Sequence, residues 1–192
     1  MKKILIGTHN TGKFKEIAYL VSKRFKKISP LSLNIKSPKE TGKSFISNSK
    51  LKANFFSKHV DYPVISDDSG LCIDSLNNKP GIYSARLAKK HGSFFKAMKF
   101  ILKKMKKKKN RKATFICSLS YKNYRGKVIT VEGRLKGKIS TKILGKRGFG
   151  YDPIFIPSGK HITFGQMLKS KKIKMDHRFI AFQKLKKKIK IY

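Results

Sequence analysis

Short apolar runs and helical patterns of hydrophobic residues alternate along this chain. The apolar run Lys2–Thr8 predicts a buried strand. After a small polar loop that contains a glycine, Phe14, Ile17, Leu20 and Val21 recur with the spacing of one helix face. The N-terminal part of the chain is therefore predicted to form a strand, a polar loop and a helix in succession.

The middle of the chain combines further helical patterns with strand-like runs. Apolar residues at helical spacing predict helices over Ser44–His59 and Phe94–Met105. Residues with a preference for strands fill Ala113–Tyr121 and Lys127–Ile139, which are predicted to form a hairpin. The segment Ile28–Ile35 is ambiguous and is compatible with a second strand.

The stretch Val64–Arg86 places acidic residues between apolar runs. Its first apolar run leads into Asp67 and Asp68, and Ser69-Gly70 follows, so we expect a turn there before Leu71–Ile73. Two adjacent carboxylates at a strand end can hold a hard cation through oxygen ligands. An ordinary Asp-Ser-Gly turn between two strands is the alternative.

The C-terminal part of the chain contains a second informative stretch. Three glycines within Gly145–Pro153 predict a flexible loop that presents Phe149 as a stacking surface. A short strand is expected at Ile154–Ile156, a short helix at Phe164–Leu168 and a last helix from about Met175 to Lys190.

Length and composition limit the classes of protein to consider. A chain of 192 residues can form one domain with a sizeable core, or two closely joined lobes. No apolar run reaches the about 18 residues of a membrane span, and no internal repeat is visible. The two cysteines, Cys72 and Cys117, lie inside apolar runs, so we expect no disulfide and a cytoplasmic location.

The charge balance is strongly basic. The chain has 48 Lys and Arg residues against 9 Asp and Glu residues, a formal net charge of +39. Such a charge attracts nucleic acid, anionic membranes or phosphorylated small molecules. The lysines are spread over nearly every segment, which is typical of a solvated surface, and non-specific nucleic-acid binding is expected at low salt. Because carboxylates are so scarce, those that lie close together are candidates for function.

The loop after the first predicted strand can bind a phosphate group. A helix that follows a small polar loop offers backbone N–H groups and the positive end of its dipole, and Lys13 could add its ammonium group. The loop lacks the P-loop spacing. Alternatively, Asn10 is only a helix N-cap and Lys13 is only exposed. Glu40 is either a helix-start acid or a second carboxylate for the cation.

The sequence motifs described above, together with several others, occur in the same order as in the inosine triphosphate pyrophosphatase family, which this chain resembles. The resemblance spans essentially the whole chain and rests on the following residues: Thr8, Asn10, Lys13, Glu40-Thr41-Gly42, Phe45, Asn48, Leu51-Lys52-Ala53, Ser66–Leu71, Pro80–Arg86, Gly148–Phe155, Thr163-Phe164, Lys172 and His177-Arg178. The chain departs from the family pattern at Ser170-Lys171-Lys172, where an acid is usual, and at Asp176, where serine is usual.

The resemblance implies an α/β fold with an elongated mixed β-sheet, flanking helices and two lobes around a central cleft. Residues 1–192 would form a single nucleoside triphosphate pyrophosphatase domain that pairs into a homodimer. The implied reaction hydrolyses ITP, dITP and XTP to the monophosphate and pyrophosphate with Mg²⁺, which removes deaminated purines from the nucleotide pool. The implied partner is therefore a small nucleotide, with no specific nucleic acid and no membrane.

The resemblance also assigns roles to individual residues. Asp68 would be the catalytic carboxylate, and the metal would be held by Glu40, Asp67 and Asp68. The triphosphate would be held by Thr8, His9, Asn10, Thr11, Gly12, Lys13, Lys52, Ser69 and Lys172. The substrate would also be bound by Phe149, Gly150, Tyr151, Asp152, His177 and Arg178, with Phe149 stacked on the purine and His177 and Arg178 donating hydrogen bonds toward its 6-keto oxygen.

These roles agree with the chemistry of the implied reaction. Hydrolysis of a triphosphate requires neutralisation of several negative charges and a water in line with the leaving group. Adenine has an amino group where these purines have the 6-keto oxygen. The buried hydrogen-bond donors of the site would then face another donor, and this mismatch rejects ATP. The competing hypothesis is a basic nucleic-acid-binding protein with relic active-site residues. The enzyme is favoured, because a relic has no reason to keep its few acids at the family's positions.

Overall fold

The computed structural model describes residues 1–124 and 126–189, so the predicted helix end at Lys190 lies outside the described residues. The chain divides into two compact units. The first unit consists of Met1–Asp68, Cys117–Gly133 and the chain from Arg178 onward, and the second consists of Ser69–Ile116 and Arg134–His177. No helix among the described residues is long and apolar enough to cross a membrane.

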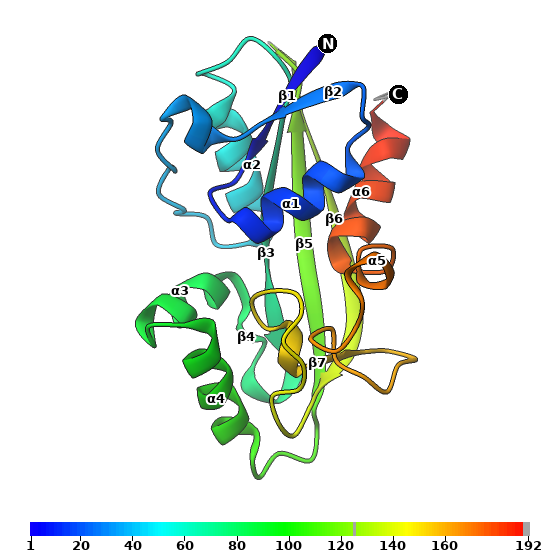
Figure 1. Ribbon diagram of the computed structural model, residues 1–192. Helices are drawn as coiled ribbons and strands as arrows, with labels where there is room; N and C mark the ends of the chain where they lie inside the picture. Colours follow the sequence, from blue (N-terminus) through cyan, green and yellow to red (C-terminus); the bar gives the residue numbers. More distant parts are fainter. Residues whose placement is uncertain (125, 190–192) are drawn as a thin grey trace. The chain divides into compact units, whose positions relative to one another are not determined.

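The N-terminal part of the chain alternates strands and helices (Figure 1). Its elements are β1 (Lys2–Gly7), α1 (Thr11–Leu20), β2 (Phe25–Ile28), a 3₁₀ turn (Pro30–Leu33), α2 (Phe45–Phe56) and β3 (Val64–Ile73). The later strands β5 (Lys112–Lys122) and β6 (Val128–Ile139) each contribute residues to both units, and α6 (His177–Lys188) is the last helix.

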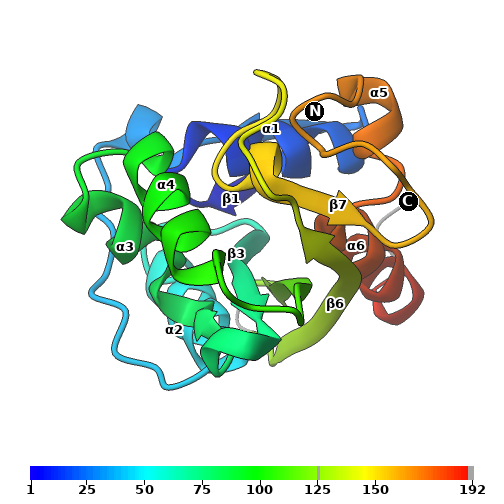
Figure 2. The same ribbon diagram turned by 90° about the horizontal axis from the view of Figure 1, so that it is seen from below.

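The second unit contains shorter elements and two adjacent helices. They are β4 (Lys79–Pro80), α3 (Ser84–Lys90), α4 (Phe94–Met105), β7 (Phe155–Pro157) and α5 (Lys169–Lys172), with 3₁₀ turns at Asp74–Leu76, Gly81–Tyr83 and Asp152–Ile154. Figure 2 shows α3 and α4 lying beside each other. The predicted helix Phe94–Met105 is confirmed with the same bounds, and Ser93 caps it by accepting a hydrogen bond from Lys96 N.

The strands form one mixed sheet in the order β2-β1-β3-β5-β6-β7, and β4 pairs with β3. Strand β1 is parallel to both β2 and β3, whereas β3–β4 and β6–β7 are antiparallel pairs. The predicted α/β fold with a mixed sheet and flanking helices is therefore confirmed.

Within the first unit, alternate residues of the strands pack against different helices. Ile4, Ile6 and Ile65 belong to a core cluster that also contains residues of α1 and α6. Leu5 and Val64 instead pack with Phe56 of α2. Because successive side chains of a strand point to opposite faces, α1 and α6 cover one face of these strands and α2 covers the other.

The second unit has its own core. Leu71 and Ile73 of β3 pack with Met98 and Ile101 of α4 and with Phe115 of β5. Further aromatic residues, Tyr151, Phe155 and Phe164, complete this cluster. The division of the chain into two units therefore follows the division of its hydrophobic core.

The predicted turn at Asp67–Gly70 is wrong, because β3 continues without interruption from Val64 to Ile73. Both readings of these residues, as a cation-binding turn and as an ordinary one, assumed that two acids and a glycine end a strand. Instead, Gly70 lets another segment approach β3, since an added Cβ would lie 2.2 Å from Gly81 O. Partners for the two carboxylates, described below, allow both acids to lie inside a buried strand.

Two shorter predictions are also wrong. The segment Ile28–Ile35 is not a strand, because β2 ends at Ile28 and Pro30 starts a 3₁₀ turn in which Ser29 Oγ accepts from Leu31 N. No helix covers Phe164–Leu168, since the described chain forms turns there and α5 starts at Lys169. The Gln166 side chain accepts from Thr163 N, which stabilises a turn in place of a helix.

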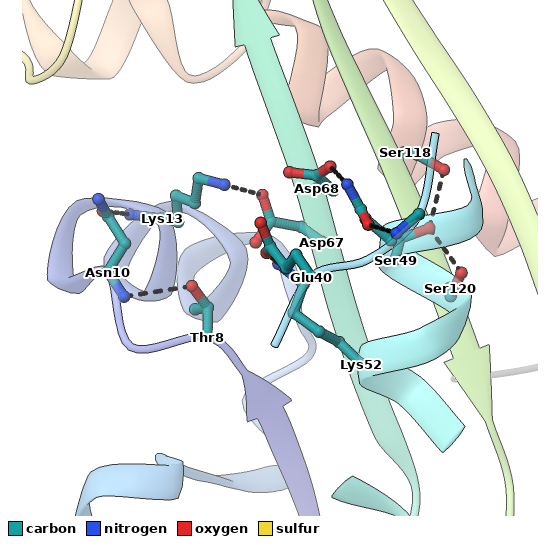
Figure 3. A network of polar contacts seen from close by, with 12 residues as sticks. Thr8, Asn10, Lys13, Glu40, Ser49, Lys52, Asp67, Asp68, Ser118 and Ser120 are labelled. Atoms are coloured by element: carbon teal, nitrogen blue, oxygen red, sulfur yellow. Dashed lines mark hydrogen bonds and ion pairs between the residues drawn. The ribbon is translucent and has the colours of Figure 1, made fainter. Parts of the chain in front are cut away.

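A buried hydroxyl cluster connects α2 to the sheet. Ser49 Oγ lies 3.0 Å from Ser118 Oγ and 2.8 Å from Ser120 Oγ (Figure 3). Ser120 Oγ lies 2.8 Å from Thr130 Oγ1. Ser49, Ser118 and Ser120 are fully buried. These bonds fix the face of α2 that points toward β5.

We expect Ser49→Ala to lower the free energy of unfolding by about 1–2 kcal/mol, because it removes a buried hydroxyl that bonds to Ile46 O and to the hydroxyls of Ser118 and Ser120. Urea unfolding followed by circular dichroism measures this change. Ser57→Ala is the matched control, since Ser57 caps the other end of α2 and its side-chain bond to Asn54 O is exposed. Equal effects of the two substitutions would contradict the assigned role of the cluster.

Candidate active site

The candidate site begins at the carboxyl end of β1. This strand lies between β2 and β3, and its connection through α1 leads to β2, whereas the connection from β2 to β3 contains α2. Helices α1 and α2 cover opposite faces of the sheet. The connections on the two sides of β1 therefore lead to opposite faces, which makes the carboxyl end of β1 a topological switch point. In parallel α/β sheets, ligands bind outside the carboxyl ends of strands at such a switch point.

The loop after β1 is built by short-range hydrogen bonds. Asn10 Oδ1 accepts from Lys13 N at 2.9 Å, and Thr8 Oγ1 accepts from Asn10 N at 3.2 Å. Asn10 is therefore the N-cap of α1, as the structural alternative predicted, and Thr11 and Gly12 occupy the first turn of the helix. The ring of His9 is held away from this turn, with Nε2 2.9 Å from Ile35 O.

Lys13 is not merely exposed, because its ammonium group contacts an acid of β3. Its Nζ lies 3.1 Å from Asp67 Oδ2, and its side chain is 15% exposed (Figure 3). Asp67 itself is fully buried, and Arg178 Nε lies 4.0 Å from the same oxygen. Burial alone would raise the pKa of Asp67, but the charges of Lys13, Lys52 and Arg178 outweigh it and lower the pKa to about 2.

Asp68 has a different environment. Its side chain follows Asp67 in β3 and so points to the opposite face, where Asn48 Nδ2 of α2 donates to Asp68 Oδ2 at 2.9 Å. Burial and the negative charge of Glu40 raise the pKa of Asp68, although Lys13, Lys52 and the Asn48 bond act against this rise. The two neighbouring acids thus have pKa values that are shifted in opposite directions.

Glu40 and Lys52 form the next ion pair. Lys52 Nζ donates to Glu40 Oε1 at 2.6 Å, with 6% of the lysine side chain and 27% of the glutamate side chain exposed. Burial would lower the pKa of Lys52, but Asp67, Glu40 and Asp68 together raise it. Lys52 therefore stays charged among three carboxylates. Figure 3 shows its side chain reaching toward Glu40 and Asp67.

This arrangement can bind a polyanion and move a proton. A carboxylate with a raised pKa accepts a proton from water more readily, whereas one with a low pKa stays charged. Here Asp68 fits the first role and Asp67 the second. Lys13, Lys52 and the N-terminal end of α1 concentrate positive charge here, which is the charge that phosphate oxygens would need.

The donor set also fits a hard divalent cation. Mg²⁺ takes one or two carboxylates and keeps several waters. Asp68 and Glu40 could be these two carboxylates, since the negative charge of Glu40 is close enough to raise the pKa of Asp68. Among the described residues, no group of three or more His, Cys, Asp or Glu side chains has the arrangement of a metal site. A Mg²⁺ ion at this site would therefore be bound by two carboxylates and by water molecules, and not by protein ligands alone.

A second group of predicted site residues lies in the second unit. Lys172 Nζ donates to Asp152 Oδ2 at 2.6 Å, and each side chain is only 3% exposed. Phe149 N also donates to Asp152 Oδ2, at 2.8 Å, and Lys172 Nζ lies 4.8 Å from the centre of the Phe149 ring. Gly148 must be glycine, because it has φ +75° and an added Cβ would lie 2.1 Å from Asp152 Oδ2.

The remaining predicted residues of the second unit have mainly structural contacts. Tyr151 OH donates to Ser84 O at 2.8 Å, and burial raises the pKa of this phenol. The ring of His177 is stacked on Phe115, with centroids 4.7 Å apart and planes at 11°. Gly150 has a positive φ of +65°, and Ser69 is a half-buried residue of β3.

The predicted site residues thus form two groups, one in each unit. The first unit brings together the acids, Lys13, Lys52, Arg178 and the loop after β1, and the second contains the Phe149–Asp152 turn with Lys172 and His177. The cleft that would join the two groups stays a prediction.

The sequence analysis missed two polar residues of the first unit. Arg178 Nη1 donates to Glu16 Oε2 at 2.7 Å, and both side chains are buried, so Glu16 holds the predicted base-reading arginine. Asn48 contacts Asp68 and received no role. Two signals in the sequence could have identified Glu16. Acids are scarce in this chain, and Glu16 lies next to Ile17, a residue of the predicted apolar face of α1.

Comparisons with known proteins identify the family to which this chain belongs. The model of the Ham1 family matches residues 4–188. A protein of Caulobacter vibrioides named dITP/XTP pyrophosphatase is 40% identical over 186 residues, which cover 96% of each chain. One of the same name from Bacillus subtilis is 38% identical over 192 residues, or 97% of this chain and 96% of that protein.

Solved structures show the same fold. The Ham1 protein of Staphylococcus aureus matches with a TM-score of 0.87 and 32% identity over 98% of each chain. A HAM1 protein of Coxiella burnetii matches with a TM-score of 0.88 and 28% identity over the full length of both chains. The family resemblance seen in the sequence is thereby confirmed, and this chain belongs to the Ham1 family.

Proposed function

We propose that this protein hydrolyses the deaminated purine nucleoside triphosphates dITP, ITP and XTP to the monophosphate and pyrophosphate, and so removes them from the nucleotide pool. The observation that carries this proposal is the pair Asp67 and Asp68. The two acids have opposite pKa shifts and lie beside Lys13, at the switch point where a phosphate group would bind. The names of the curated relatives support the same substrate class.

In this proposal, the first unit binds the triphosphate. The N-terminus of α1 and the residues Thr8–Lys13 hold phosphate oxygens through N–H groups and the Lys13 ammonium. Lys52 adds a point charge from α2, and Ser69 and Lys172 complete the predicted set. Concentrated positive charge stabilises the extra charge that the leaving pyrophosphate acquires.

Asp68 acts as the general base. It takes a proton from the attacking water, whose oxygen forms a bond to the α-phosphorus while the bond from that phosphorus to the bridging oxygen breaks. Pyrophosphate leaves with the bridging oxygen, and the nucleoside monophosphate remains. The raised pKa of Asp68 favours this proton transfer, and Asp67 stays ionised to hold Lys13 in place.

We also propose Mg²⁺ as the cofactor, held by Glu40 and Asp68 with Asp67 close by. When bound, it would neutralise phosphate charge and provide Lewis acidity. In the structure, Lys13 pairs with Asp67 and Lys52 pairs with Glu40, so two ammonium groups lie beside the carboxylates that would hold the cation.

Base selection is proposed to come from Phe149, His177 and Arg178. Phe149 would stack on the purine, and the two basic residues would donate to its 6-keto oxygen. The bond between Phe149 N and Asp152, together with the Lys172 contact, holds the aromatic ring in position. Gly150 and Tyr151 belong to the same turn and would line the base site.

The wider setting follows from the family resemblance. We propose that residues 1–192 work as one catalytic domain, that two copies form a homodimer, and that the protein is cytoplasmic. Both cysteines are buried, which is consistent with a reducing compartment. Analytical ultracentrifugation tests the dimer, which a sedimentation coefficient of a single 22.0 kDa chain would contradict.

We expect the purified protein to release pyrophosphate from dITP, ITP and XTP at least about 100-fold faster than from ATP, because ATP presents an amino group to donors. A coupled pyrophosphate assay over natural and deaminated triphosphates, with Mg²⁺ or with EDTA, measures this. EDTA should abolish the release, and readdition of Mg²⁺ should restore it. Equal rates on ATP, or full activity in EDTA, would contradict the proposal.

The nucleic-acid-binding alternative makes the opposite prediction in the same samples. It expects RNA or DNA binding that survives physiological salt, together with no pyrophosphate release. The proposed enzyme is expected to bind nucleic acid only at low salt, because its dispersed lysines give counterion-driven affinity alone.

A further inference from the structure

Asn48 contacts both Asp68 and the segment that carries Glu40. It lies in the first turns of α2 and is fully buried. Its Nδ2 donates to Asp68 Oδ2 at 2.9 Å, and its Oδ1 accepts from Gly42 N at 2.8 Å. A single planar amide group therefore bridges the strand that carries Asp68 and the segment that carries Glu40.

The bridge has little freedom to move. An added Cβ at Gly42 would lie 2.5 Å from Asn48 Oδ1 and 2.9 Å from Asn48 N, so the backbone of this segment packs directly on the asparagine. Glu40 lies two residues before Gly42 in the same segment. The position of Glu40 relative to Asp68 is therefore coupled to the side chain of Asn48.

Asn48 is itself held from both sides along the helix. The capping box of Ser44 and Ser47 fixes the start of α2 just before it. Directly after it, Ser49 is bonded to Ser118 and Ser120 of β5. These bonds fix the rotation of α2 about its axis and its position along the sheet. They therefore also fix the direction of the Asn48 amide group.

We infer that Asn48 is a positioning residue, which orients the carboxylate of Asp68 and sets its distance from the Glu40 segment. This inference rests on the proposed function. An amide is suited to the task because it can donate to a carboxylate and accept from a backbone N–H at the same time. Aspartate has the same shape but lacks the donor, and leucine has a similar volume but lacks both groups.

The test compares Asn48→Asp and Asn48→Leu with wild type. The Asn48→Asp substitution keeps an oxygen that can accept from Gly42 N, but it removes the N–H group that donates to Asp68. We expect kcat for dITP to fall about 100-fold in each variant while KM changes by less than about threefold, because misplacement of a reacting group affects the reaction more than binding. Asn54→Asp is the matched control, since Asn54 lies on the same helix and its bond to Lys122 is exposed.

The rates are divided by the folded fraction, which is obtained from thermal unfolding of each variant. A purely structural role predicts that kcat per folded molecule is unchanged, and this result would overturn the inference. If the wild-type protein releases no pyrophosphate, the proposed function fails instead. If neither variant folds, the wild-type NMR spectrum still decides, because the side-chain amide protons of Asn48 should exchange slowly and rapid exchange would overturn the inference.

Discussion

Replacement of Asp68 by asparagine should reduce kcat for pyrophosphate release by about 10³-fold or more. The amide cannot accept a proton from water, and it lowers the negative charge available to a cation. The fold should persist, because the new side chain keeps an oxygen that can accept from Asn48 Nδ2. A pyrophosphate assay with dITP, together with circular dichroism of the variant, measures both effects.

Asp61→Asn is the control for this substitution, since Asp61 is an exposed acid that precedes β3. Its removal changes the net charge of the chain by the same amount. A wild-type rate in Asp61→Asn and a lost rate in Asp68→Asn would assign the effect to the position of the acid. A near-native rate in Asp68→Asn would refute its role as the base.

Replacement of Asp152 by alanine should lower the free energy of unfolding by about 3–5 kcal/mol. The substitution leaves the buried ammonium group of Lys172 without the carboxylate that now lies 2.6 Å away. It also removes the acceptor of the Phe149 N–H group. Urea unfolding followed by circular dichroism measures the loss.

The double variant Asp152→Ala/Lys172→Met separates charge burial from packing. Removal of both charges should recover part of the lost stability, because no charged group then remains buried at this position. Asp74→Ala serves as the exposed control. A loss for Asp152→Ala below about 1 kcal/mol would show that the buried pair does not stabilise the second unit.

Local patterns predicted most helices and strands. The spacing of Phe94, Met98 and Ile101 was sufficient for α4, because its apolar face is regular and a serine precedes it. The asparagine at position 10 likewise predicted the start of α1. In contrast, β3 contains two acids and a glycine at its centre, and local sequence rules indicate a turn for such residues. Lysine, arginine and asparagine side chains from other elements contact these acids and allow them to lie inside the strand.

The candidate site could be predicted in part. The scarce acids and the loop Thr8–Lys13 were recognised from their neighbours in sequence and from the family resemblance. The partners of these residues were not, since they come from distant segments. Glu16 and Arg178 are 162 residues apart, and Asn48 and Asp68 are 20 residues apart. Ion pairs and hydrogen bonds of this kind depend on the packing of α1, α2 and α6 on the sheet, which no local pattern encodes.

The products formed from dITP test the central claim most directly. Hydrolysis in H₂¹⁸O with Mg²⁺, followed by mass spectrometry, identifies the bond that breaks and the phosphorus that water attacks. We predict dIMP that carries one ¹⁸O, and unlabelled pyrophosphate in equal amount. Formation of dIDP and inorganic phosphate, or of labelled pyrophosphate, would contradict attack at the α-phosphorus by a water that Asp68 activates.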